Sequence, residues 1–266
     1  MGFIASIHVK TLLSRVIALT TVAVALAACG STKDSGAGTV IRVGTLGDAP
    51  PNVYQENGQY TGFDNELLKA VAGKVGLTPE FVGTDFSALL GQVGNRTFDV
   101  GSSAIAATEE RKKNVDFSDS YDFEYMSILT TDGAGVSDEN SLKGKRVAVI
   151  QATVGDNYLT KQLPEAQAVR FPTYDAGIAA LKSGGVQAFV LDLTIAKKYA
   201  ADNGFKVTKA ITTDVPHGFA VRKGNTELRD KLNSGLKQVI ADGTWLKLHD
   251  KFIPDTPVPA QFKPGA

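Results

Sequence analysis

Residues 146–162, Arg-Val-Ala-Val-Ile-Gln-Ala-Thr-Val-Gly-Asp-Asn-Tyr-Leu-Thr-Lys-Gln, show the pattern that decides the fold. The apolar run 146–150 predicts a buried strand, residues 151–155 a turn, and residues 156–162 a helix. The same alternation extends along most of the chain. It predicts strands at 40–43, 80–82, 98–101, 146–150, 169–171, 186–191 and 219–221, and helices at 64–75, 87–93, 108–113, 156–162, 174–183, 194–202, 226–242 and 244–252. Such alternation indicates an α/β fold with mainly parallel sheets.

Two short breaks, near residues 130–135 and 212–216, divide this pattern into three sections. The first break is rich in glycine and the second contains a proline. A chain that leaves one domain and returns to it around an inserted domain produces such a layout. We therefore expect a discontinuous first lobe, 39–130 with 217–252, and a second lobe, 131–216. The two chain crossings then form a two-stranded hinge beside a cleft.

Residues 1–28 have the features of a secretory signal peptide, because Lys10 and Arg15 precede a short apolar run that ends in Leu-Ala-Ala. An ordinary membrane-spanning helix needs about 20 apolar residues, and this run is shorter. Cys29 follows it, is the only cysteine in the chain, and resembles the lipidated cysteine of a bacterial lipobox. A plain signal peptide with a chance cysteine is the alternative. We expect a lipidated, flexible spacer over 29–38 that tethers the folded body to the outer face of the cytoplasmic membrane.

The composition of the mature chain excludes several classes of function. After removal of residues 1–28, 26 of the 28 basic residues remain against 28 acidic ones, a net charge of about −2. This balance does not favour nucleic acid or an anionic membrane surface as a partner. His8, His217 and His249 are far apart, so we expect no metal, no cofactor and no catalytic cluster. Four prolines within 253–266 predict an irregular tail.

Arg111 is the first candidate binding residue, because it lies in the first turn of the predicted helix 108–113. A cation at this end opposes the helix dipole by about 0.3–1 kcal/mol. A bound carboxylate reverses the sign, since the helix N-terminus and the guanidinium both attract it. The alternative is a solvated arginine that pairs with Glu109 or Asp116.

Further candidates follow predicted strands or begin helices. Gln151, Ala152 and Thr153 form a strand-to-helix turn that could receive an anion, although it lacks the lysine and glycine spacing of a nucleotide P-loop. Asp192 ends an apolar strand, where ligands bind in open α/β sheets. Phe86 could form a stacking wall. The alternative for residues 151–153 is a plain turn, and the alternative for Asp192 is a helix N-cap. The alternative for Phe86 is an aromatic side chain of the core.

Several motifs, in order along the chain, resemble those of the polar amino-acid family of ABC-transporter solute-binding proteins. The motifs are YTGFDNEL at 60–67, TEERKK at 108–113, VDFSDSY at 115–121, LKGKRV at 142–147, ELRDKL at 227–232 and DGTW at 242–245. Each is weak alone, but their order and spacing are specific. The resemblance covers about residues 40–252 and implies the type II periplasmic-binding fold. Glutamine-binding and lysine/arginine/ornithine-binding proteins are members of this family.

The resemblance also implies a role for each candidate residue. Arg111 corresponds to the arginine that binds the ligand α-carboxylate, and Thr153 helps from the other lobe. Asp192 corresponds to the acid that takes the α-ammonium, and Phe86 to an aromatic that packs on the ligand. With the neighbouring turn residues Gln151 and Ala152, these form most of the expected ligand site.

The chain departs from the family pattern at positions that contact the ligand side chain. Residues 103–106 read Ser-Ala-Ile-Ala in place of S/A-G-x-T, so Ser103, Ala104 and Ala106 are expected contacts without the usual threonine hydroxyl. Leu46 replaces a common acid and Ala49 a common aromatic. We expect room for a side chain larger or less polar than glutamine, and a preference for neutral or acidic amino acids over cationic ones.

The resemblance implies a monomeric lipoprotein that binds an amino acid between two closing lobes and presents it to an ABC permease. An enzyme of the same fold, such as a cyclohexadienyl or arogenate dehydratase, is the alternative. That alternative needs a positioned general acid, and no such group stands out in the candidate segments. A sensor domain is a third class, but the sequence shows no spanning helix or signalling module after the body.

Overall fold

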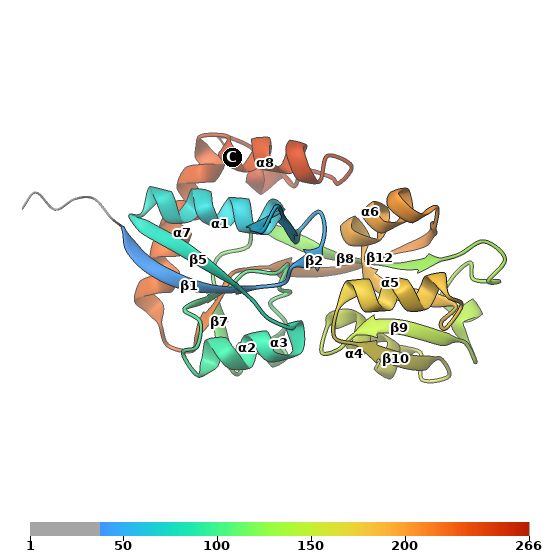
Figure 1. Cartoon of the computed structure of the whole chain (residues 1–266). Helices are drawn as coiled ribbons and strands as arrows, with labels where there is room; N and C mark the ends of the chain where they lie inside the picture. The colour runs from blue at the N-terminus through green and yellow to red at the C-terminus, as the bar shows by residue number, and fades with distance from the viewer. Residues whose placement is uncertain (1–37, 266) are drawn as a thin grey trace, which may run out of the picture. The chain divides into compact units, whose positions relative to one another are not determined.

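The structure is a computed structural model that describes residues 38–265 (Figure 1). The predicted signal peptide, Cys29 and the predicted spacer up to residue 37 lie outside the described residues. The strands of the first sheet are arranged in the order β5-β1-β6-β13-β7. Their bounds are β1 (Thr39–Thr45), β5 (Leu77–Gly83), β6 (Val100–Gly101), β7 (Val115–Phe117) and β13 (Ala220–Arg222). Strand β1 pairs in parallel with β5 and β6, whereas β13 pairs antiparallel with β6 and β7.

The second sheet has the order β10-β9-β11-β8-β12. Its strands are β8 (Asp122–Thr130), β9 (Arg146–Ile150), β10 (Gln167–Phe171), β11 (Ala188–Asp192) and β12 (Lys206–His217). Strand β9 pairs in parallel with β10 and β11, and β8 pairs antiparallel with β11 and β12. Each large sheet therefore combines parallel and antiparallel pairs, and the expected two-lobed α/β fold is confirmed.

Helices cover both sheets. The first lobe, defined as the first sheet with its helices, contains α1 (Phe63–Lys74), α2 (Phe86–Gly94), α3 (Glu109–Lys112), α7 (Thr226–Ala241) and α8 (Thr244–Phe252). The second lobe, defined in the same way, contains α4 (Val154–Gln162), α5 (Tyr174–Lys182), α6 (Leu193–Asn203) and the short 3-10 helix Asn140–Leu142. Helices α1 and α7 approach closely at Gly235, where an added Cβ would lie 2.5 Å from the carbonyl oxygen of Val71.

Strands β8 and β12 form the hinge. They pair antiparallel from Lys206 opposite Thr130 to His217 opposite Asp122. The chain thus enters the second sheet with β8, earlier than the predicted break near 130–135. The predicted break at 212–216 is wrong, because these residues belong to β12. The register of β12 shifts between Thr212 and Pro216, which accommodates a proline that cannot donate to the ladder.

Two further parts of the chain differ from the sequence expectation. The segment between β1 and α1 forms a small antiparallel sheet of β2 (Asp48–Ala49), β3 (Val53–Glu56) and β4 (Gln59–Thr61). The proline-rich tail contains a 3-10 helix, Ala260–Phe262, whose Phe262 side chain is buried. The Phe262 ring centroid lies 4.8 Å from that of Trp245, so the tail completes the core beside α8.

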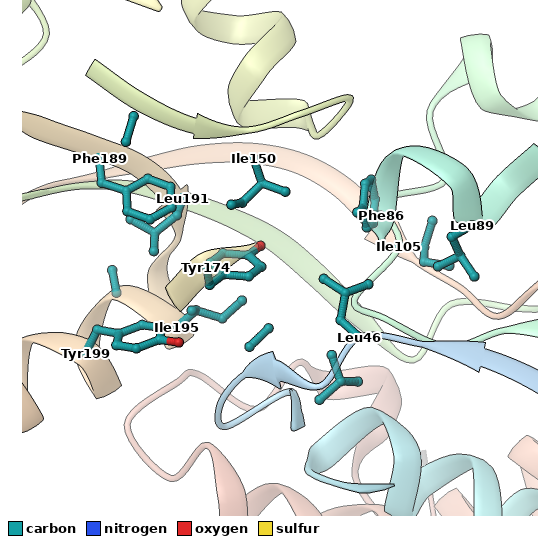
Figure 2. Close-up of a cluster of buried hydrophobic side chains, with 14 of the residues drawn as sticks. Leu46, Phe86, Leu89, Ile105, Ile150, Tyr174, Phe189, Leu191, Ile195 and Tyr199 are labelled. Carbon is teal, nitrogen blue, oxygen red and sulfur yellow. The ribbon is translucent and has the colours of Figure 1, made fainter. Parts of the chain in front are cut away.

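Three clusters of buried side chains form the core. One lies between the first sheet and α1, α7 and α8, and another lies in the second lobe around β9, β11 and α4. The third joins the two lobes, since it contains Leu46 and Phe86 from the first and Ile150, Tyr174 and Leu191 from the second (Figure 2). This third cluster surrounds the candidate site.

Candidate functional site

A cavity of about 20 Å³ lies between the two lobes. The first lobe, together with the hinge strand β8, contributes Phe86, Ser103, Ala104, Arg111 and Met126. The second lobe contributes Ile150, Thr153, Val154, Gly155, Tyr174, Val190, Leu191 and Asp192. Most of these side chains are apolar, with one cation and one carboxylate among the lining residues. Ser103, Thr153 and Tyr174 add hydroxyl groups to these two charges. Several polar groups that converge on one cavity are typical of a small-molecule site.

Arg111 bridges the two lobes. Thr108 caps α3 by accepting a hydrogen bond from the Arg111 backbone N–H at 3.3 Å, which directs the side chain into the cleft. The guanidinium donates to the carbonyl oxygen of Ala106 at 2.9 Å and to that of Ala152, in the second lobe, at 3.0 Å. Its central carbon lies 5.0 Å from the ring centroid of Phe86. Helix α3 has four residues, so the positive charge here comes mainly from the guanidinium.

The β9–α4 turn places Thr153 at the opposite wall. The Thr153 hydroxyl accepts a hydrogen bond from the Asp156 backbone N–H at 3.2 Å, and it donates to the carbonyl oxygen of Ile150 at 2.8 Å. Asp156 in turn accepts from the Ala152 N–H at 3.1 Å and pairs with Arg170 at 2.9 Å. These contacts hold the turn rigid before a ligand arrives.

Two alanines of the site have a strained backbone. Ala104 and Ala152 have φ angles of 44° and 67°, in the left-handed region that residues with a Cβ rarely adopt. The Ala104 N–H donates to Asp64 Oδ1 at 2.8 Å, which holds the 103–106 loop in place. Such strain persists where the surroundings fix it, and it is common at ligand sites.

Asp192 lies at the carboxyl end of β11, as the sequence predicts. It occupies the N-cap position of α6, but its side chain makes no capping hydrogen bond. Instead its Oδ2 accepts a hydrogen bond from the Tyr174 hydroxyl at 3.0 Å. The alternative that Asp192 serves only as a helix N-cap is therefore wrong.

Two further carboxylates lie near Asp192. Burial raises the pKa of Asp64, which accepts a hydrogen bond from the Tyr121 hydroxyl. Burial also raises the pKa of Asp122 to about 6, and the neighbouring His217 side chain, 4.0 Å away between Nδ1 and Oδ2, opposes that rise. The negative charge of Asp192 contributes to both increases in pKa. The raised pKa values favour the neutral forms of Asp64 and Asp122, so Asp192 supplies the negative charge at this end of the cavity and Arg111 the positive charge.

The structure brings together most of the predicted site residues. Phe86, Ser103, Ala104, Arg111, Thr153 and Asp192 line the cavity. Ala106, Gln151 and Ala152 do not line it, although Ala106 and Ala152 supply the carbonyl oxygens that orient Arg111.

The sequence interpretation missed residues that line or support the cavity. Tyr174 and Ile150 were predicted only as parts of a helix and a strand, and Met126 lies on a hinge strand that was not predicted. Asp64 was predicted only as part of the family motif YTGFDNEL at 60–67. The expected extra room at Ala49 and Ala106 is not found, because neither residue lines the cavity.

Comparison with known proteins assigns the family. The sequence matches bacterial extracellular solute-binding proteins, family 3, over residues 41–255. The chain belongs to this family. The ABC transporter glutamine-binding protein GlnH of Bacillus subtilis is 31% identical over 212 residues, which cover 76% of each chain. The arginine-binding extracellular protein ArtP of the same species is 33% identical, with 86% of this chain and 92% of the relative covered.

A solved structure supports the same assignment. The ancestral amino acid-binding protein AncCDT-1, a precursor of cyclohexadienyl dehydratase, matches with a TM-score of 0.75 and 35% identity. The match covers 80% of this chain and 95% of that chain. As a member of family 3, this protein is an extracytoplasmic solute-binding protein. Within residues 38–265, no helix is long and apolar enough to cross a membrane, and no group of acidic, histidine or cysteine side chains could hold a metal ion.

Proposed function

We propose that this protein binds an amino acid between its lobes and delivers it to an ABC permease. The observation that carries the proposal is one cavity that is lined by Arg111 from the first lobe and Asp192 from the second. The two charges match the α-carboxylate and α-ammonium of a zwitterion. Burial of an ion is favourable only when it is paired and hydrogen-bonded, so this arrangement selects for both ligand charges at once.

Closure of the lobes explains how binding is signalled to a permease. Direct hydrogen bonds already join the lobes: Thr194 donates to Asn52 at 2.6 Å, and the Asp175 N–H donates to Asp48 at 3.1 Å. A ligand that contacts both lobes adds interactions only in the closed form, and it therefore shifts the population toward that form. The β8–β12 hinge is the element that the motion bends.

The charges of the lining residues favour a ligand without a cationic side chain. Among the cavity-lining residues, Arg111 and Asp192 are the charged ones, and the zwitterion uses both. The other walls near them include Met126, Ile150 and Leu191, which offer no carboxylate to an additional cation. Burial of an unpaired charge costs several kcal/mol. We propose that neutral or acidic amino acids bind better than lysine, arginine or ornithine.

A thermal-shift screen of the purified mature protein against the common amino acids tests the proposed function. A ligand at 100 times its dissociation constant stabilises the folded state by about 2.7 kcal/mol. For a protein of this size, that corresponds to an increase in Tm of about 5–10 °C. A screen in which every amino acid leaves the Tm unchanged contradicts the proposal, whereas arginine as the strongest stabiliser contradicts only the charge preference.

One observation favours the dehydratase alternative: AncCDT-1 is described as a precursor of cyclohexadienyl dehydratase. The relatives reported above are named as binding proteins, which agrees with a non-catalytic role. Among the cavity-lining residues described, Asp192 is the carboxyl group, and Tyr174 already donates to it. An assay of the purified protein with prephenate and arogenate tests this alternative. Conversion of either compound shows that the protein is an enzyme.

We propose that Cys29 carries the lipid that anchors a monomeric protein to the outer face of the membrane. Replacement of Cys29 by alanine is expected to release the protein from the membrane fraction and to leave its amino-acid affinity unchanged. The physical reason is that the lipobox-like segment 26–29 precedes a Gly-Ser-rich spacer and comes, in sequence, well before Phe86, the first residue that lines the cavity. Fractionation of cells with immunodetection measures the effect. Wild-type protein that is soluble without detergent contradicts lipid anchoring.

A further inference from the structure

Asp64 is a fully buried acid in the first lobe. It is the second residue of α1. One of its oxygens, Oδ1, accepts hydrogen bonds from the Ala104 N–H at 2.8 Å and from the Tyr121 hydroxyl. Within residues 38–265, the other oxygen, Oδ2, is buried and has no hydrogen-bond partner. A buried polar atom without a partner lowers the stability of a fold, so its presence in this position calls for an explanation.

The two groups that bind Oδ1 connect the ligand cavity to the hinge. Ala104 lines the cavity. Tyr121 directly precedes the hinge strand β8, and its N–H donates to the carbonyl oxygen of His217, the last residue of β12, at 3.1 Å. A single oxygen of Asp64 therefore fixes a cavity-lining residue relative to both hinge strands.

The parts of the chain on either side of Ser103 and Ala104 have other anchors. The Ser102 N–H donates to the carbonyl oxygen of Gly44, in β1, at 3.0 Å. The segment 105–107 is bonded to the end of β12, where the Ala107 N–H donates to Pro216 at 2.8 Å. Between these anchors, the bond from the Ala104 N–H to Asp64 fixes the part of the loop that lines the cavity.

Ala104 has a backbone conformation that alanine disfavours. Its φ angle of 44° lies in the left-handed region, where the Cβ approaches the backbone too closely. The family pattern S/A-G-x-T has glycine at this position, and glycine adopts such angles without that clash. An alanine keeps the conformation only where its surroundings fix it. The hydrogen bond to Asp64 is such a constraint.

We propose that Asp64 is a positioning residue for amino-acid binding, which keeps Ser103 and Ala104 in the conformation that lines the cavity before a ligand arrives. The inference rests on the proposed function, because it assumes that the amino acid binds in this cavity. A segment that already has its bound conformation costs less to order on binding. If the conformation is populated only in part of the molecules, the apparent affinity falls by the same fraction.

The proposed role depends on an acceptor atom rather than on a charge. Burial raises the pKa of Asp64, and the hydrogen bond from Tyr121 and the nearby His217 oppose this rise. A carboxyl oxygen accepts hydrogen bonds in the ionised and in the neutral form. Asp64→Asn retains an oxygen that can accept both bonds, whereas Asp64→Ala removes the acceptor.

Isothermal titration with the amino acid found by screening tests the proposal. We expect Asp64→Ala to weaken binding by about tenfold or more, and Asp64→Asn by less than about threefold. We expect the added substitution Ala104→Gly to restore at least about threefold of the affinity that Asp64→Ala loses, because glycine adopts the left-handed conformation without a constraint. In the wild type, where Asp64 already fixes this conformation, Ala104→Gly is expected to change the affinity by a smaller factor.

Leu68→Ala is the matched control for a loss of stability. Leu68 lies on the same helix, α1, and is buried in the core cluster between the first sheet and α1, α7 and α8. The substitution removes buried methyl groups and is expected to lower the Tm. It is expected to leave the amino-acid affinity unchanged, because Leu68 does not bind the 103–104 segment through a hydrogen bond.

The outcomes separate this inference from the proposed function. An Asp64→Ala variant that binds as tightly as the wild type overturns the inference, as does a loss of affinity that Ala104→Gly does not reduce. An equal loss in Leu68→Ala shows that Asp64 acts through stability alone, which also overturns it. If Asp64→Ala does not fold, Asp64→Leu, which fills the space without an acceptor, is expected to show the same loss and the same rescue. A wild type that binds no amino acid overturns both.

Discussion

Replacement of Arg111 by alanine is expected to weaken amino-acid binding by more than about 2 kcal/mol, or about 30-fold or more, because a buried ligand carboxylate loses its charged partner. The guanidinium now donates to the carbonyl oxygens of Ala106 and Ala152, one from each lobe. The substitution therefore also removes a direct link between the lobes. Isothermal titration with the amino acid found by screening measures the effect.

Two variants separate the role of the charge from the role of its geometry. Arg111→Lys keeps a positive charge but loses the planar fork, so an intermediate affinity is expected. Lys112→Ala removes the next cation of the same helix, which is exposed and pairs with Glu109 at 2.8 Å, and no change is expected. An Arg111→Ala variant that binds as tightly as the wild type shows that this arginine is not part of the site.

Replacement of Asp192 by asparagine is expected to weaken binding by about 2–5 kcal/mol, because the ligand α-ammonium loses its carboxylate while it stays buried. Asparagine has nearly the same shape and retains an oxygen that can accept the hydrogen bond from Tyr174. The loss therefore reports the charge rather than a change in packing. Titration with the screened amino acid gives the difference in free energy.

A ligand that lacks the ammonium group completes this test as a double-mutant cycle. The desamino analogue of the screened amino acid should bind weakly to the wild type and equally weakly to Asp192→Asn. Asp202→Asn is the matched control, since Asp202 lies on the same helix, α6, and forms an exposed ion pair with Lys198. If the substitution at Asp192 weakens the analogue as much as the amino acid, then Asp192 has a structural role only.

Local sequence determines much of this protein. The run 146–162 becomes β9, a turn and α4, because apolar periodicity and the Thr153 cap act between near neighbours. Arg111 and Asp192 are found from the sequence for a similar reason. Each lies at the end of a regular element, in a motif of a few residues, and the site at the carboxyl ends of the strands follows from the fold class.

The tertiary structure decides what depends on distant parts of the chain. Residues 212–216 contain a proline and were predicted as a break, yet pairing with β8, over 80 residues earlier, makes them part of a strand. Tyr174 begins a predictable helix, but the direction of its side chain depends on how α5 packs against β9 and β11 and on the hydrogen bond to Asp192. Ala106 and Ala152 act through their carbonyl oxygens, which no side-chain pattern reveals. The sequence alone therefore determined the α-helices, the two charges of the site, and strands β1, β5, β6, β9, β10, β11 and β13. Long-range packing decided the hinge strands and the cavity, because strands or side chains from distant parts of the chain must meet to form them.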